Sequence, residues 1–98
     1  MTSPLFIFAR FDPLPGQFDA VRDELLRVLE PTRAEPGCRS IHLFESAVEP
    51  RCLFIHSEWV DEAAFEAHAR LPHVERMVTA VEPLIAAPLR AVRTSKAG

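Results

Sequence analysis

Glycine, lysine and tyrosine are scarce in this sequence, and their scarcity excludes several classes of enzyme. With three glycines, at Gly16, Gly37 and Gly98, the chain contains neither a dinucleotide-binding fingerprint nor a phosphate-binding P-loop. Its one lysine, Lys96, lies in the polar carboxyl-terminal tail, which leaves no candidate for Schiff-base chemistry. Tyrosine is absent. Acid–base chemistry therefore falls to His, Asp, Glu or Cys side chains.

The chain also lacks a cysteine cluster, a long apolar run and a surplus of basic residues. Cys38 and Cys52 form no C-x-x-C pair and are too few for a cysteine-rich zinc site. No segment approaches the ~20 apolar residues of a membrane span, so we expect a reduced, cytoplasmic protein with no membrane partner. Eleven Lys and Arg against fourteen Asp and Glu give a net charge of −3, which argues against nucleic acid as a partner.

Length and composition indicate one globular domain. The chain has 98 residues, of which 48% are hydrophobic and 26% charged, close to the average for globular proteins. We therefore expect residues 1–98 to form a single domain. The polar tail, residues 94–98, has nothing to bury and is expected to be disordered.

Apolar residues spaced at strand and helix periods predict seven elements. They are a strand at 5–11, a helix from 17 that Pro31 bends or ends, strands at 38–46 and 52–60, helices at 62–70 and from 72, and a last strand at 89–93. This β-α-β-β-α-α-β order is typical of an α+β, ferredoxin-like (split βαβ) fold, with a four-stranded antiparallel sheet and helices on one face. The first and third strands are apolar on both faces, so we expect a homodimer that covers the open face with a second sheet.

The middle two strands are predicted to form a hairpin centred on Glu49. In that register His42 lies opposite His56, on the face that also carries Ser40 and Glu58. Such a cluster suits a base oriented by a carboxylate or a metal site, and equally a solvated or interface polar patch. The same register separates Cys38 from Cys52 by roughly 26 Å, which excludes a disulfide between them.

Three segments carry a family resemblance. They are Glu35-Pro36-Gly37-Cys38, the run from Glu58 through Trp59 to His68, and Pro72-His73. Together they resemble the antibiotic biosynthesis monooxygenase family. The resemblance implies a dimeric α/β barrel and cofactor-independent oxidation of a small quinol or polycyclic phenol by O₂. Two alternatives stay open: a non-catalytic dimeric domain for small ligands or stress response, and another reaction on the same barrel, such as isomerisation or dehalogenation.

The sequence also departs from the family pattern at identifiable positions. Ser57 stands where many members carry a carboxylate, and Ile41 where many carry a tyrosine. The haem-binding positions of the haem-degrading branch, an Asn, a Trp and a His, correspond to Ala9, His68 and Val78 here. We therefore expect neither haem nor any other cofactor.

The chemistry implied by the resemblance needs a base near neutrality beside an apolar pocket for a small aromatic ligand or substrate. His68 is the first candidate base; the alternative is that it only packs a helix end. His42 and His56 are the assisting catalytic candidates. Trp59, Phe65 and His73 are the candidates for substrate binding, together with Arg10, which interrupts an apolar strand and suits a substrate anion or an exposed edge. No resident metal is expected.

Overall fold

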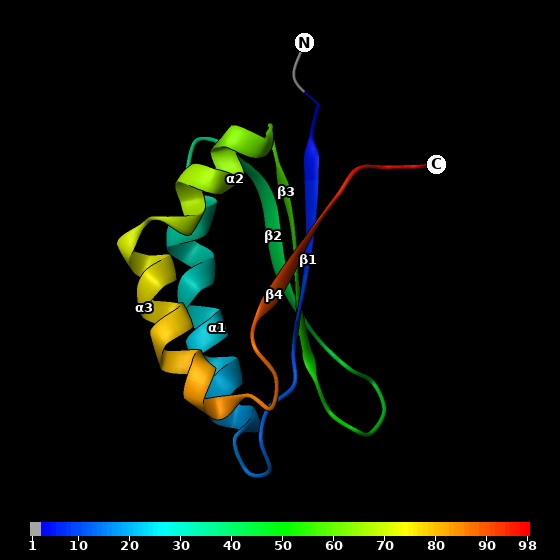
Figure 1. Ribbon diagram of the computed structural model, residues 1–98, viewed down its shortest axis with the longest axis vertical. Coiled ribbons are helices and arrows are strands. Elements are labelled where there is room, and N and C mark those ends of the chain that lie inside the picture. The colour runs from blue at the N-terminus through cyan, green and yellow to red at the C-terminus, as the bar shows by residue number, and fades with distance from the viewer. Residues whose placement is uncertain (1–2) are drawn as a thin grey trace.

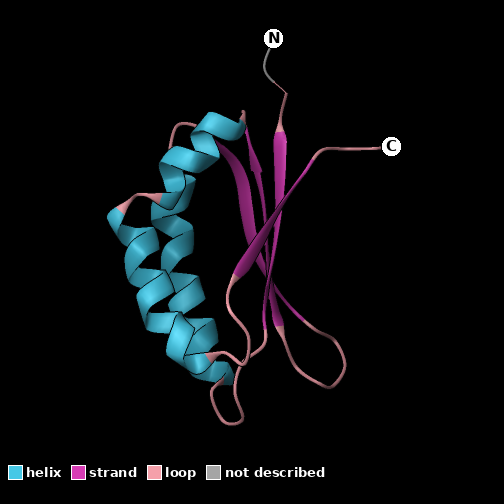
Figure 2. Ribbon diagram, in the orientation of Figure 1, coloured by secondary structure: helices cyan, strands magenta, loops and turns pink. Residues whose placement is uncertain are grey.

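The computed structural model describes residues 3–98, which form one sheet covered by helices on one side (Figures 1 and 2). The elements are β1 (Leu5–Phe11), α1 (Phe18–Arg33), β2 (Cys38–Glu45), β3 (Leu53–Trp59), α2 (Glu62–Ala69), α3 (Pro72–Val81), the short 3₁₀ helix η1 (Glu82–Leu84) and β4 (Arg90–Thr94). The strand order is β2-β3-β1-β4, and all neighbours are antiparallel. The predicted ferredoxin-like fold is confirmed.

The register of the β2–β3 hairpin agrees with the prediction. His42 pairs with His56 and Phe44 with Phe54, and a β-bulge between Cys38 and Ser40 shifts the register only at the far end. Both cysteines are free.

Helix α1 continues past Pro31 to Arg33, so of the two predicted outcomes Pro31 does not end the helix. Proline removes one intrahelical hydrogen bond, but the residues around it are held by packing. Val28, Leu29 and Thr32 are all buried on the side of the helix that faces the sheet. Tertiary packing therefore outweighs the local preference to end the helix, since most helical stability in proteins comes from a buried apolar face.

The next two helices begin where the sequence predicts. The Asp61 side chain accepts a hydrogen bond of 2.9 Å from the Ala64 N–H and so caps α2. Pro72 occupies the first turn of α3, where its missing N–H costs nothing. Among residues 3–98, none of the helices combines the length and the apolar character that a membrane span requires.

The core lies between the helices and one face of the sheet (Figure 2). Alternate residues of β1 and β3 point into it, including Ile7, Phe11, Leu53 and Trp59, all of them buried. The opposite face is covered by no helix and carries large apolar side chains that are about half exposed: Phe8 at 52%, Phe44 at 51% and Val92 at 44%. We call it the open face.

Candidate active site

A cavity of about 190 Å³ lies between the helices and the covered face of the sheet. Its wall is apolar except for two side chains, Ser57 from β3 and His68 from α2. The apolar lining comes from all four strands and all three α-helices: Ile7, Ala9, Phe11, Val28, Ile41, Ile55, Phe65, Ala69, Val74, Met77, Val78, Leu89 and Ala91. A largely apolar cavity with a few polar groups is the usual form of a site for a small organic molecule.

His68 is held in this wall by a carboxylate that the sequence did not single out. Its Nδ1 lies 2.8 Å from Oε2 of Glu35, and the side chains are only 12% and 11% exposed. An ionised carboxylate can only accept, so the imidazole donates through Nδ1–H. In the neutral ring this leaves Nε2 as the nitrogen with a free lone pair. The arrangement is a base with an orienting carboxylate.

Burial lowers the pKa of His68 below its ordinary value, while the hydrogen bond and charge of Glu35 oppose that shift. The net effect favours the neutral imidazole near pH 7. A neutral imidazole is the form that accepts a proton, so the environment of His68 suits the predicted role of a base.

A close approach of the chain brings Glu35 to His68. The turn before β2 passes so near α2 that a Cβ added at Gly37 would overlap the Ala64 Cβ. The Val60 N–H also donates to the Gly37 carbonyl at 2.9 Å. Ala64 and His68 are four residues apart in α2 and therefore share one face of the helix. The turn that touches Ala64 thus delivers Glu35 one helical turn further on.

His73, from the first turn of α3, binds the same carboxylate oxygen. Its Nε2 lies 2.9 Å from Oε2 of Glu35, and its side chain is 17% exposed. The rings of His68 and His73 are 6.1 Å apart. His73 does not line the cavity. The structure therefore brings these two predicted site residues together, because both imidazoles bind the same oxygen of Glu35.

Trp59 and Phe65 surround the His68 ring. The Trp59 ring centroid lies 4.6 Å from that of His68, and Phe65 lies 5.8 Å from both. Trp59 is fully buried, and its Nε1–H donates to the Ser57 hydroxyl at 3.0 Å. Phe65 lines the cavity, whereas Trp59 lies outside its lining and packs the imidazole in place.

His42 and His56 lie on the open face, separated from His68 by the sheet. They face each other across β2 and β3, as predicted, and the His56 ring lies 4.7 Å from that of Phe8. The neighbouring residues Ile41 and Ser57 line the cavity on the other side. Because successive strand residues point to opposite faces, His42 and His56 are not part of the His68 cavity.

Arg10 also lies away from the cavity. It is exposed, and its Nε lies 3.0 Å from the Asp12 carboxylate. The hydrogen bond to Asp12 raises the pKa of Arg10. The side chain is thus exposed, although β1 lies inside the sheet and not at its edge.

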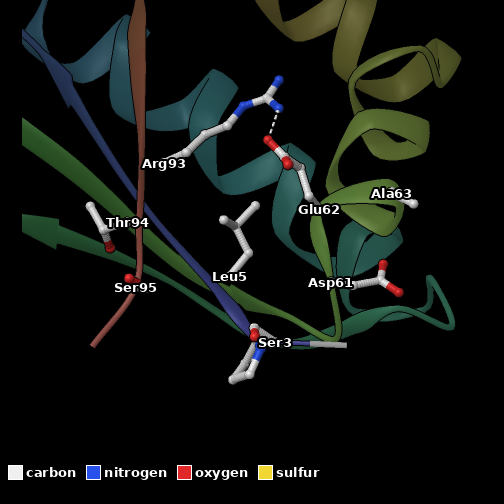
Figure 3. A pocket seen from close by; sticks show the side chains of 9 residues that line it. Ser3, Leu5, Asp61, Glu62, Ala63, Arg93, Thr94 and Ser95 are labelled. Atoms are coloured by element: carbon white, nitrogen blue, oxygen red, sulfur yellow. Dashed lines mark hydrogen bonds and ion pairs between the residues drawn. The ribbon is translucent and has the colours of Figure 1, made fainter. Parts of the chain in front are cut away.

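A larger, more open hollow of about 600 Å³ lies between the amino end of β1, the start of α2 and the end of β4 (Figure 3). Arg93 crosses it to Glu62, with the two side chains 2.6 Å apart, and also reaches Glu66 at 3.1 Å. The guanidinium is thus already paired. The hollow contains no histidine or cysteine, so it offers no base comparable to His68.

Glu35 and Ser57 belong to the site but were not among the candidate site residues predicted from the sequence. Glu35 stands within the Glu35-Pro36-Gly37-Cys38 segment, so a signal was present. That segment marks a turn, and a turn does not say which helix it will touch. Ser57 was noted only as a departure from the family pattern; parity gave a second signal, since Ser57 shares a strand face with the buried Ile55 and Trp59.

Comparisons with known proteins agree on one family. Residues 4–80 match the family model described as antibiotic biosynthesis monooxygenase. Two relatives are described as putative monooxygenases. Rv0793 of Mycobacterium tuberculosis is 37% identical over 89 residues, which cover 91% of this chain and 87% of that protein. YcnE of Bacillus subtilis is 31% identical over 80 residues, which cover 82% and 84%.

Solved structures give the same result. The structure of Rv0793 superposes with a TM-score of 0.91 at 32% identity, covering 98% of this chain and 97% of that one. PA3566 of Pseudomonas aeruginosa superposes with a TM-score of 0.90 at 26% identity, covering 100% and 98%. The similarity therefore extends over the whole fold, including every element that builds the cavity.

Proposed function

The chain belongs to the antibiotic biosynthesis monooxygenase family, and we propose that it is a cofactor-independent monooxygenase that oxidises a small quinol with O₂. The observation that carries the proposal is the buried Glu35–His68 pair in the wall of an apolar cavity. Family membership and the monooxygenase relatives support the class of reaction. The substrate class is argued from the site, and the independence from a cofactor is what the resemblance to the family implies.

The reaction begins with proton transfer. His68 Nε2 accepts a proton from a hydroxyl of the bound quinol, and Glu35 stabilises the imidazolium that forms. The resulting phenolate is electron-rich and passes one electron to O₂. Recombination of the two radicals forms a bond between O₂ and a ring carbon and gives a peroxide anion, which takes back the proton held by the His68 imidazolium. The O–O bond then breaks, and water leaves with the hydrogen of that ring carbon. In sum, a quinol and O₂ give a hydroxyquinone and water, and each product receives one of the two oxygen atoms of O₂.

The apolar lining serves this chemistry in two ways. It holds a flat ring by burial of apolar surface, and it keeps water away from the radical pair. Ser57 is the other polar group of the wall. Because its hydroxyl already accepts from Trp59, its own O–H is free to donate to a substrate oxygen on which negative charge develops.

The size of the cavity favours the smaller of the expected substrates. A cavity of about 150 Å³ accommodates benzene. At about 190 Å³, the cavity beside His68 suits a substituted single ring and is small for a polycyclic phenol. We therefore assign a one-ring quinol as the substrate class.

The open face supports a homodimer. Phe8, Phe44 and Val92 are each about half exposed, and they lie on one surface of the sheet with the half-buried Phe54. An apolar surface of this kind is unusual on a monomer of 98 residues. Two copies related by a two-fold axis cover it by packing sheet on sheet, which yields the α/β barrel that the resemblance implies.

The activity is tested by O₂ consumption with a panel of one-ring quinols in the presence of a metal chelator. His68→Ala should lower kcat/KM by about 10²–10⁴-fold, the usual contribution of a general base. Glu35→Gln should lower it by about 10–100-fold. Because Glu35 raises the pKa of His68, Glu35→Gln should also move the acidic limb of the pH profile to lower pH. Glu75→Gln, an exposed carboxylate of α3, is the matched control.

Three outcomes separate the alternatives. Equal rates in wild type and His68→Ala would refute the proposed base. Tight binding of quinols without O₂ uptake would instead favour the non-catalytic ligand-binding domain. Turnover that proceeds without O₂ would favour another reaction on the same barrel.

The dimer is tested by light scattering after gel filtration. Phe8→Glu places a charge in the centre of the open face and should give monomers. Leu26→Glu, at a helix position that is 48% exposed against 52% for Phe8, should leave the dimer intact. A wild-type monomer at micromolar concentration would refute the proposed assembly.

A further inference from the structure

We propose that Glu35, His68 and His73 together bind a divalent transition-metal ion of the Zn²⁺ class. Among the described residues 3–98, this is the one set of three potential ligands whose donor atoms all lie within 4.8 Å of one another. The inference concerns a binding site, and only its effect on catalysis rests on the proposed function.

The three donor atoms lie close enough together to share a single ion. His68 Nδ1 and His73 Nε2 lie 2.8 and 2.9 Å from the same oxygen, Oε2 of Glu35. With metal–nitrogen and metal–oxygen bonds of about 2.0–2.2 Å in tetrahedral geometry, the ligand atoms of one ion are about 3.3–3.6 Å apart. Conversion of the hydrogen-bonded cluster into a metal site therefore needs each imidazole nitrogen to move away from Oε2 by about half an ångström. The two nitrogens, which lie within 4.8 Å of each other, must reach the same separation.

The kind of donor selects the class of ion. Two imidazoles and one carboxylate suit Zn²⁺, Fe²⁺ or Co²⁺, whereas Ca²⁺ and Mg²⁺ prefer sites made of oxygen atoms. Three protein ligands leave at least one coordination position open, as in catalytic zinc sites. The three side chains are 11–17% exposed, so they are held by their surroundings before an ion arrives.

Each ligand comes from a different part of the fold. Glu35 lies in the turn before β2, His68 in α2 and His73 at the start of α3. Trp59 packs on the His68 ring and limits its rotation. An ion at this point would link the three segments, so binding should also stabilise the fold against unfolding.

Metal binding and base catalysis exclude each other at His68. In the metal-free protein Nδ1 carries the proton and Nε2 has the free lone pair. An ion takes the Nδ1 lone pair, so the single proton of the neutral ring moves to Nε2. The nitrogen left for the cavity then donates instead of accepting. Bound metal should therefore inhibit oxidation of the quinol by removing the base.

The binding test uses Co²⁺ alone as the probe, added to chelator-treated protein of the full chain. The expected result is one Co²⁺ per chain with visible ligand-field absorption. His73→Ala removes one ligand and should weaken binding by more than about 100-fold, since even loss of an outer-shell partner costs about 10–100-fold. His42→Ala, which removes a histidine on the open face, is the matched control and should bind Co²⁺ as wild type does.

A second variant guards against misfolding. Glu35→Gln keeps the shape of the side chain and should also lose Co²⁺ binding. Circular dichroism shows whether each variant is folded. Absence of Co²⁺ binding to the wild type, or binding that survives in folded His73→Ala and Glu35→Gln, would overturn the proposed site.

The inhibition test compares rates with and without Zn²⁺ for each variant separately. For wild type, the rate with Zn²⁺ divided by the rate without it should fall well below one and return to one on chelation. For His73→Ala this ratio should stay near one. Co²⁺ binding by a protein that shows no oxidation even when metal-free would refute the proposed function and leave the metal site standing. Oxidation of the quinol by a protein that binds no Co²⁺ would refute the metal site and leave the proposed function standing.

Discussion

Replacement of Gly37 by alanine should push the turn that carries Glu35 away from α2. The added Cβ would overlap the Ala64 Cβ, and the Val60 side chain lies 3.5 Å away on the same side. Both neighbours are short and stiff, so the backbone itself must move. Gly37 does not have a positive φ, so the alanine is opposed by this contact and not by its own conformation.

The expected cost follows from this geometry. Overpacking of a tight contact costs about 1–3 kcal/mol. Against this, replacement of glycine by alanine stabilises by about 0.4–1 kcal/mol through the unfolded chain. We therefore expect Gly37→Ala to lower the free energy of unfolding by about 1–2 kcal/mol, a large fraction of the 5–15 kcal/mol typical of a domain.

A double-mutant cycle identifies the cause. Ala64→Gly alone should cost about 1 kcal/mol through helix propensity. In Gly37→Ala combined with Ala64→Gly the methyl group moves to the other side of the same contact, and the clash disappears. The free energy of unfolding of the double variant should therefore exceed the value expected from adding the two single effects by about 1–2 kcal/mol.

The assay is urea unfolding of the wild type, the two single variants and the double variant. A shift in midpoint is taken as a change in stability only where the slope m is unchanged. Gly16→Ala is the control. Gly16 has φ +79° and open space around it, so the strain there is conformational and should not couple to Ala64→Gly. Additive effects for Gly37 and Ala64 would refute the argument that their contact brings Glu35 to His68.

Three further predictions concern single side chains. Thr32→Val should raise the free energy of unfolding by about 1 kcal/mol in chemical denaturation, because the buried Thr32 hydroxyl has no hydrogen-bond partner among residues 3–98. Ser57→Ala should lower it by about 1–3 kcal/mol, because it leaves the buried Trp59 N–H unpaired; an unchanged midpoint would contradict this. In chelated protein, the lowered pKa of His68 means that the unfolded chain takes up a proton before the folded one as the pH falls. Wild type should therefore lose more thermal stability than His68→Gln between about pH 7.5 and about pH 5.5, and equal losses would contradict the shift.

Local sequence signals predicted most of the secondary structure correctly. The Asp61 cap, Pro72 at the start of α3 and the apolar periods act within a few residues, so a single sequence contains them. The turn position also fixed the hairpin register, which made His42 and His56 partners. At Pro31 the sequence left two outcomes open, a bend or an end, because the local preference of proline competes with the packing of α1 on the sheet.

The fold and the residue types of the site were within reach of the sequence; the assembly of the site was not. Composition and pattern predicted a ferredoxin-like domain and made histidine the candidate base, because these depend on local periods and on which side chains titrate near neutrality. Only the tertiary structure decided that Glu35 meets His68 and His73, and that His42 and His56 lie across the sheet from them. Contacts between residues 33 and 38 positions apart depend on how closely the turn and α2 pack, and no local spacing encodes that distance.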